Sequence, residues 1–180
     1  MSAVTDAVPV APTSIAEAKA HLRIEGDSED ALVGRLVGAA TALCESFTGT
    51  QLIARPVRET VPVGAEWRRL SVTPVQTVGT VTGHAADGAS FVLPPDAYAV
   101  DIDANGDGWV RVTQPGTARR ATVEYQAGRA ESWTELPETL RQGIMRLAAH
   151  FYTHRDAADD AGPPAAVAAL WRPWRRMRLR

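Results

Sequence analysis

Apolar residues recur at helical spacing near both ends of the chain and give way to strand-like alternation in the middle. In the first half, an amphipathic stripe with intervals of four, four, three and four residues consists of Leu32, Leu36, Ala40, Leu43 and Phe47. Acidic residues at 29 and 30 favour a helix start, because they oppose the positive end of the helix dipole, and Gly49 is a typical helix stop. The pattern therefore predicts a helix over about 28–49.

One further helix is predicted before this one and two are predicted after it. Ser14 and Glu17 have the spacing of a capping box, and apolar positions follow them, which predicts a short helix over about 15–24. Pro137 and Glu138 suit the first turn of another helix. Its apolar stripe consists of Leu140, Ile144, Leu147 and Phe151. A last short helix is expected over about 164–171.

Residues 51–127 differ in composition and pattern, with frequent Val and Thr, recurrent Gly and Pro, and no helical periodicity. Alternating apolar positions between turn sequences predict antiparallel strands. The expected strands are 51–61, 67–72, 75–83, 90–93, 97–102, 108–113 and 119–126. The fold class is thus α+β, a helical body of about four helices with an inserted antiparallel β-rich module and an extended C-terminal tail. The expected boundaries are a flexible N-terminal arm at 1–12, the body at 13–50 and 130–171, the β-module at 51–129 and the tail at 172–180.

Charge is distributed unevenly along the chain. Residues 171–180 contain five arginines and no acid, whereas the rest carries 14 basic and 21 acidic side chains. An acidic body argues against broad nucleic-acid binding, which needs clustered cations, and the basic end points to one local docking element. No apolar run approaches the length that spans a bilayer, and residues 1–12 lack the features of a signal peptide, so no membrane contact is expected. The single cysteine, Cys44, is expected to pack in the core.

The sequence offers little for catalysis or for cofactor and metal binding. Residues 101–106 match the start of a calcium-binding loop, but Val112 stands where a bidentate glutamate is required, so a hairpin turn is favoured. His150 and His154 lie one helical turn apart without further ligands nearby. His21 and His84, read as helix and loop residues, have no recognisable nucleophile pattern around them. We therefore predict that the chain is not an enzyme and binds no cofactor or metal.

The C-terminal tail is the feature that points to a function. Exposed tryptophans on a free terminus would leave much apolar surface in water, and Trp and Arg dominate the energetic centres of protein interfaces. Docking into another protein is the first interpretation. The alternatives are a membrane-surface peptide, a DNA-binding module acting through the basic tail, and a tail folded back on its own domain.

Four stretches, in this order, resemble the head–tail connector (adaptor) family of long-tailed phages and gene transfer agents. They are the opening at 13–24, the acid-started helix at 28–49, the helix at 136–155 and the closing segment at 167–175. The smallest members of that family are nearly all helical, and this chain departs from them by its long β-rich middle.

The resemblance implies a structural subunit of the virion or phage-like particle, made in the bacterial cytoplasm. It implies a homo-oligomeric ring, commonly a dodecamer, between the portal protein and a stopper or other tail-proximal protein, with DNA passing through its channel. The residues expected to dock to the portal are Trp171, Arg172, Trp174, Arg175, Arg176, Met177, Arg178, Leu179 and Arg180. Those expected to hold the long helix on the ring body, or to contact a neighbour at its end, are Leu140, Ile144, Leu147, Phe151, Tyr152 and Arg155. Deletion of residues 171–180 is expected to leave a folded protein that no longer joins the portal.

Overall fold

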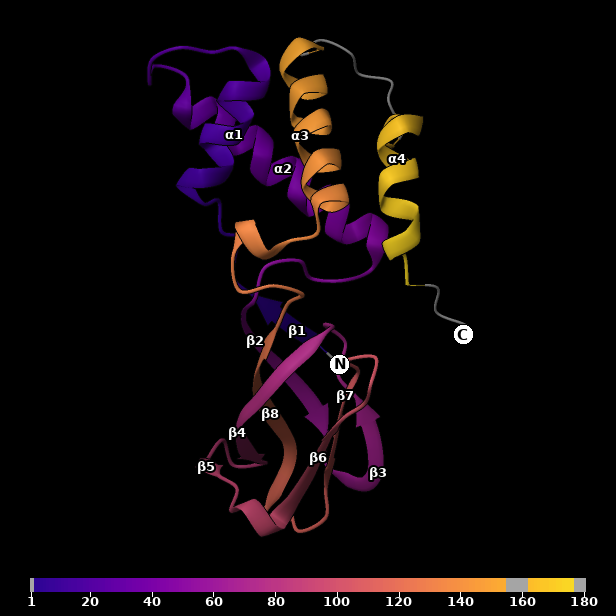
Figure 1. Cartoon of the computed structure of the whole chain (residues 1–180). Coiled ribbons are helices and arrows are strands. Elements are labelled where there is room, and N and C mark those ends of the chain that lie inside the picture. The colour runs from indigo at the N-terminus through magenta and orange to yellow at the C-terminus, as the bar shows by residue number, and fades with distance from the viewer. Residues whose placement is uncertain (1, 155–161, 177–180) are drawn as a thin grey trace. The chain divides into compact units, whose positions relative to one another are not determined.

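The computed structural model describes residues 2–154 and 162–176 and divides the chain into two compact units (Figure 1). The helical unit comprises Val8–Ile53 and Ala130–Arg180. The β unit comprises Met1–Ala7 and Ala54–Arg129. Within the described residues, four α-helices and two antiparallel sheets confirm the predicted α+β class.

The helical unit is built around the two long helices that the apolar stripes predicted. Its α-helices are α1 (Pro12–Leu22), α2 (Asp30–Thr48), α3 (Glu138–Thr153) and α4 (Ala165–Trp171), with short 3-10 turns η2 (Trp133–Glu135) and η3 (Arg172–Trp174). α3 packs against each of the other three helices. Gly49 ends α2 with a φ of 69°, a left-handed conformation that glycine adopts without strain. Cys44 is fully buried in this core, and burial raises the pKa of its thiol.

The start of α1 differs from the predicted capping box. The helix begins at Pro12, whose missing N–H is not needed in a first turn. Ser14 Oγ donates to the Ala11 carbonyl over 2.7 Å, and the Glu17 carboxylate accepts instead from the indole N–H of Trp133, 2.8 Å away. Glu17 therefore ties α1 to the segment before α3, a long-range use of the side chain that local spacing does not reveal.

The β unit contains a five-stranded and a three-stranded antiparallel sheet around one core. The strand order is β1-β2-β8-β4-β5 in the first sheet and β3-β7-β6 in the second. The elements are β1 (Ser2–Thr5), β2 (Arg55–Pro62), β3 (Gly64–Arg69), β4 (Val75–Ala85), β5 (Ser90–Val92), η1 (Pro95–Ala97), β6 (Tyr98–Ile102), β7 (Gly108–Val112) and β8 (Ala118–Ala127). Inward valines of the central strands, with Tyr125, Leu70 and Leu93, fill the space between the sheets.

The N-terminal arm predicted to be flexible contains a strand. β1 pairs antiparallel with β2, with Val4 opposite Arg58 and Thr5 opposite Val57. Val4 itself is 67% exposed, so the pairing depends on backbone hydrogen bonds and not on burial of an apolar side chain. That is why the hydrophobic pattern gives no sign of this strand.

The aspartate-rich segment between β6 and β7 is a hairpin turn, as predicted. Asp103 Oδ1 accepts from the backbone N–H groups of Asn105 and Asp107, at 2.8 and 2.9 Å. Gly106 supplies the positive φ of 74° that the turn needs. Among the described residues, no helix is long and apolar enough to cross a membrane.

Candidate functional site

The predicted docking tail begins inside the core of the helical unit. Trp171 is 0% exposed, and its ring lies 5.8 Å from the ring of Phe47. Its indole N–H points at the Leu140 carbonyl, 3.4 Å away. Gly143 makes room for it, because a Cβ at that position would overlap the indole Nε1 and lie 2.8 Å from two ring carbons. The prediction that Trp171 docks to a partner is thus wrong for this conformation, since its ring is already covered by its own helices.

The next residues continue along the same helices. Trp174 is half-buried, and its indole N–H donates to the Thr139 hydroxyl over 2.9 Å. The Arg175 guanidinium lies over the Phe47 ring at 5.6 Å, a cation–π distance. The backbone N–H of Arg176 donates to the Thr48 carbonyl at the end of α2, 2.8 Å away. The described part of the tail therefore packs against its own unit, one of the alternatives that the sequence leaves open.

Two predicted docking side chains of this segment face solvent. Arg172 and Arg175 are exposed, and Arg176 is partly exposed. Four further predicted docking residues lie outside the described residues, namely Met177, Arg178, Leu179 and Arg180. Within the described residues, the structure therefore separates a packed part, Trp171 and Trp174, from the exposed side chains of Arg172 and Arg175.

The residues predicted to hold α3 on the body lie mainly in the core. Leu140 and Ile144 are 0% exposed and Leu147 is 1% exposed, whereas Phe151 is half-buried at the edge of the same cluster. The Tyr152 hydroxyl donates to the carboxylate of Glu29, 2.7 Å away at the start of α2. This contact lies within the subunit. Arg155 lies outside the described residues.

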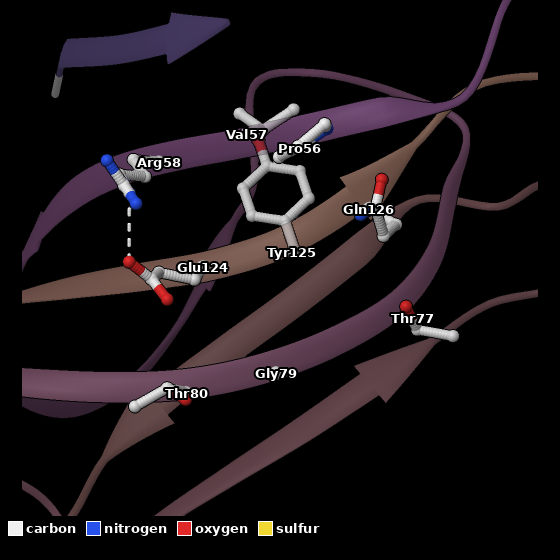
Figure 2. A pocket seen from close by; sticks show the side chains of 9 residues that line it. All are labelled: Pro56, Val57, Arg58, Thr77, Gly79, Thr80, Glu124, Tyr125 and Gln126. Carbon is white, nitrogen blue, oxygen red and sulfur yellow. Dashed lines mark hydrogen bonds and ion pairs between the residues drawn. The ribbon is translucent and has the colours of Figure 1, made fainter.

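Sequence reasoning missed the polar surface of the β unit. One hollow of about 240 Å³ is formed by β2, β4 and β8, where Arg58 and Glu124 form an ion pair of 2.9 Å (Figure 2). These two residues stand directly opposite each other across the sheet. Outward and buried residues alternate along β2 and along β8, and this period of two is the sequence signal that marks Arg58 and Glu124 as outward residues. Pairing of the two strands is required to bring these side chains together.

The expected histidine positions are partly corrected. His84 is a strand residue of β4, not a loop residue, and its ring nitrogens lie 2.9 Å from Ser90 Oγ and 2.8 Å from Thr122 Oγ1. His150 and His154 stack with their ring centroids 4.4 Å apart. Within residues 2–154 and 162–176, no group of three or more potential metal ligands comes together.

Comparison with known proteins gives one family match. Residues 12–84, which cover α1, α2 and the first strands, match the model of the phage gp6-like head-tail connector protein family. Among curated proteins, a catalase-peroxidase of Picosynechococcus sp. (strain ATCC 27264 / PCC 7002 / PR-6) is 27% identical over 135 residues. The match covers 71% of this chain but only 18% of the length of that curated relative. The activity of the larger protein is therefore not transferred to this chain.

Solved structures match nearly the whole chain. A chain in the neck of an empty gene transfer agent (GTA) particle, computed with C6 symmetry, has a TM-score of 0.80 and 25% identity, and the match covers 99% of this chain and 97% of that one. A chain in the virion of a native GTA particle has a TM-score of 0.78 and 27% identity, with the same coverage. A chain in the neck of a native GTA particle computed with C12 symmetry has a TM-score of 0.73 and 27% identity, covering 98% and 97%. With the match over residues 12–84, these likenesses confirm the resemblance read from the sequence: the chain is similar to the head–tail connector family over residues 12–84 and to chains of GTA particles over nearly its whole length.

Proposed function

We propose that this chain is a structural subunit of the head–tail junction of a phage-like particle, in which copies of it form a ring under the portal. The observation that carries the proposal is the match over 99% of the chain to a protein of the GTA neck. Both units take part in that match, so the β unit, which the smallest connectors lack, belongs to the shared architecture. No catalytic role is included in the proposal.

The symmetries of the similar assemblies support a closed ring. One neck was computed with C6 symmetry and another with C12 symmetry, and a ring of twelve copies satisfies both. Cyclic rings use heterologous contacts, in which one face of a subunit meets a different face of the next. A dodecamer with a central channel for DNA follows as the proposed assembly.

The exposed cationic end of the C-terminal segment is the proposed contact with the portal. Trp171 and Trp174 anchor the base of this segment to α2 and α3, so that Arg172 and Arg175 are held at the surface. Guanidinium groups bind carboxylates through paired, charge-assisted hydrogen bonds. We assign the continuation of the contact to Met177, Arg178, Leu179 and Arg180. A stopper or other tail-proximal protein would bind the opposite side of the ring.

The burial of Trp171 changes how this docking must be tested. Deletion of residues 171–180, expected from sequence to be harmless to folding, removes a fully buried tryptophan and is expected to destabilise the helical unit. Deletion of 177–180 removes only residues beyond the last described anchor, and the double variant Arg172→Glu/Arg175→Glu reverses two exposed charges. Arg35→Glu, at an exposed position of α2 outside the segment, is the matched charge-reversal control.

The assay mixes purified protein with portal rings and measures co-sedimentation, followed by image averaging of the complexes. We expect both C-terminal variants to stay folded and to lose portal binding by at least tenfold, whereas Arg35→Glu binds normally. The deletion should keep the wild-type Tm, and the double variant should lower it slightly, because Arg175→Glu removes the cation–π contact with Phe47. Normal attachment of both variants would refute docking through the C-terminal segment. Averages without cyclic symmetry would refute the ring.

The alternative function is DNA binding through the basic tail, because residues 171–180 carry five arginines and no acid. That function predicts retardation of duplex DNA with a steep salt dependence that is lost on deletion of 177–180. Absence of binding at low salt excludes it.

A further inference from the structure

A second hollow on the outer face of the five-stranded sheet has a composition unlike the rest of the β unit. It is open to solvent, has a volume of about 610 Å³ and lies at the start of β8, next to β4 and β2. Its lining residues are Thr60, His84, Ala85, Ala86, Arg119, Arg120 and Thr122. The lining thus combines two arginines, a histidine and two hydroxyls, and it contains no acid.

A break in strand register places both arginines at this hollow. His84 of β4 pairs with Arg120 of β8, but Ala85 pairs with Ala118, so that Arg119 is an extra residue on β8. Neighbouring residues of a regular strand point to opposite faces, whereas a bulge turns an additional side chain to the same side. Arg119 and Arg120 are both exposed, between the buried Ala118 and Ala121. The bulge therefore produces a pair of guanidinium groups beside one hollow.

Hydroxyl and imidazole groups line the hollow beside the arginines in a hydrogen-bonded network. His84 Nε2 lies 2.8 Å from Thr122 Oγ1, and its Nδ1 lies 2.9 Å from Ser90 Oγ. Thr122 Oγ1 is also 3.3 Å from Thr60 Oγ1 on the neighbouring strand. Four strands thus hold the imidazole and the two threonine hydroxyls in place, which gives a ligand pre-positioned hydrogen-bonding groups.

The positive charge of the hollow is not neutralised within the described part of the chain. None of the described carboxylates lies within ion-pair distance of the guanidinium of Arg119 or Arg120. Glu124, further along β8, is paired with Arg58 (Figure 2). Asp87, in the turn after the hollow, accepts from the backbone N–H of Ala89 over 3.0 Å. The acids closest along the chain are therefore already engaged, whereas the two arginines of the bulge have no anionic partner among the residues that the structure describes.

We propose that this hollow is a carboxylate-binding site that receives an acidic segment of a partner protein. Two guanidinium groups with hydroxyl groups in the same lining match the oxygens of one or two Asp or Glu side chains. A nucleic acid fits less well, because affinity for a phosphate backbone comes from many cations along its path, and the remaining arginine of this face is neutralised by Glu124. The contact goes beyond the proposed portal docking, since it lies on the β unit and does not involve the C-terminal segment.

The test uses the full chain and a short peptide of alternating glutamate and glycine as the probe. Binding is measured by calorimetry and located by amide chemical-shift changes in the NMR spectrum. We expect shifts around His84, Arg120 and Thr122, and binding at least tenfold weaker in Arg119→Gln/Arg120→Gln, because two charge-assisted hydrogen-bonding groups are lost. Arg58→Gln, which removes the already paired arginine of the same face, is the matched control and is expected to change the affinity less than twofold.

The outcomes separate the possible occupants. Peptide binding that survives in the Arg119→Gln/Arg120→Gln variant, or the absence of peptide-induced shifts at the hollow, would overturn the proposal. A duplex DNA probe that shifts the same signals at lower concentration than the peptide would also overturn it and assign the hollow to phosphates. Because these measurements need neither portal nor ring, their failure leaves the docking assay of the C-terminal segment unaffected.

Discussion

The contact between Gly143 and Trp171 allows a quantitative test of how the C-terminal segment is anchored. Gly143 lies in the middle of α3, where alanine would normally be preferred by about 1 kcal/mol. A Cβ at this position would overlap three atoms of the Trp171 indole. The indole cannot move away easily, because Phe47 packs against it and the side chain is fully buried.

The magnitudes follow from these two opposing effects. In Gly143→Ala, steric overlap in a packed core is expected to destabilise the helical unit by about 3 kcal/mol, the upper end of the usual range. The gain in helix propensity offsets about 1 kcal/mol of this, leaving a net loss of about 2 kcal/mol. Trp171→Ala alone removes a buried indole and is expected to destabilise by about 3–5 kcal/mol. In that background the overlap is gone, so adding Gly143→Ala should stabilise by about 1 kcal/mol.

A double-mutant cycle measures this reversal of sign. Urea unfolding is followed by circular dichroism at 222 nm, which reports on the helices and does not depend on tryptophan fluorescence. The coupling free energy between the two positions is expected to be about 3 kcal/mol. Gly34→Ala is the matched control: its Cβ would meet only the side chain of Ile15, at 3.4 Å, so this exchange in α2 should be neutral or stabilising. A stable Gly143→Ala variant, or additive effects of the two substitutions, would refute the proposed packing.

Three further predictions concern single residues. Burial, with a hydrogen bond to the fully buried Glu59, raises the pKa of Tyr125 above its ordinary value of 10.0, so the folded state holds the phenol proton more tightly than the unfolded state. The free energy of unfolding should therefore be constant through neutral pH and fall as the pH rises above about 10, and Tyr125→Phe should flatten that fall in alkaline urea titrations. Because burial raises the pKa of the Cys44 thiol, native protein should react with a thiol-specific disulfide reagent only at the rate of unfolding, and a rapid stoichiometric reaction would contradict its placement. Arg23 ends α1 with a φ of 57°, so Arg23→Gly should raise stability by about 0.5–1 kcal/mol in urea unfolding, whereas a lower stability would show that the arginine side chain makes a compensating contact.

Local patterns in the sequence were sufficient to predict the long helices and most strands. The stripes from Leu32 to Phe47 and from Leu140 to Phe151 correspond to α2 and α3 because a helix buries residues every three to four positions. The short strand β1 escaped prediction because its pairing depends on backbone hydrogen bonds to β2, which leave no hydrophobic signature. Ser14 and Glu17 have the correct spacing for a capping box, yet their side chains bond to Ala11 and Trp133.

The candidate docking elements show the same division. The basic, acid-free C-terminal end is a property of composition, and its charge is evident in the sequence. Whether its tryptophans face a partner or their own subunit is decided by the space beside Gly143 and by the ring of Phe47, both distant along the chain. The hollow at Arg119 and Arg120 needed the register of β4 and β8, because a bulge changes the side to which a residue points without changing the residue.

The sequence by itself determined the α+β class, the positions of the main helices, the acidic body with a basic end, and the family resemblance. These properties depend on residues close together in the chain, or on composition, and local spacing and charge are sufficient to express them. Only the tertiary structure decided that Trp171 is a core residue, that Glu17 bonds to Trp133, and that Arg119 and Arg120 share one hollow with His84. Each of these depends on which distant segments pack or pair with one another, and that arrangement is set by the folding of the whole unit.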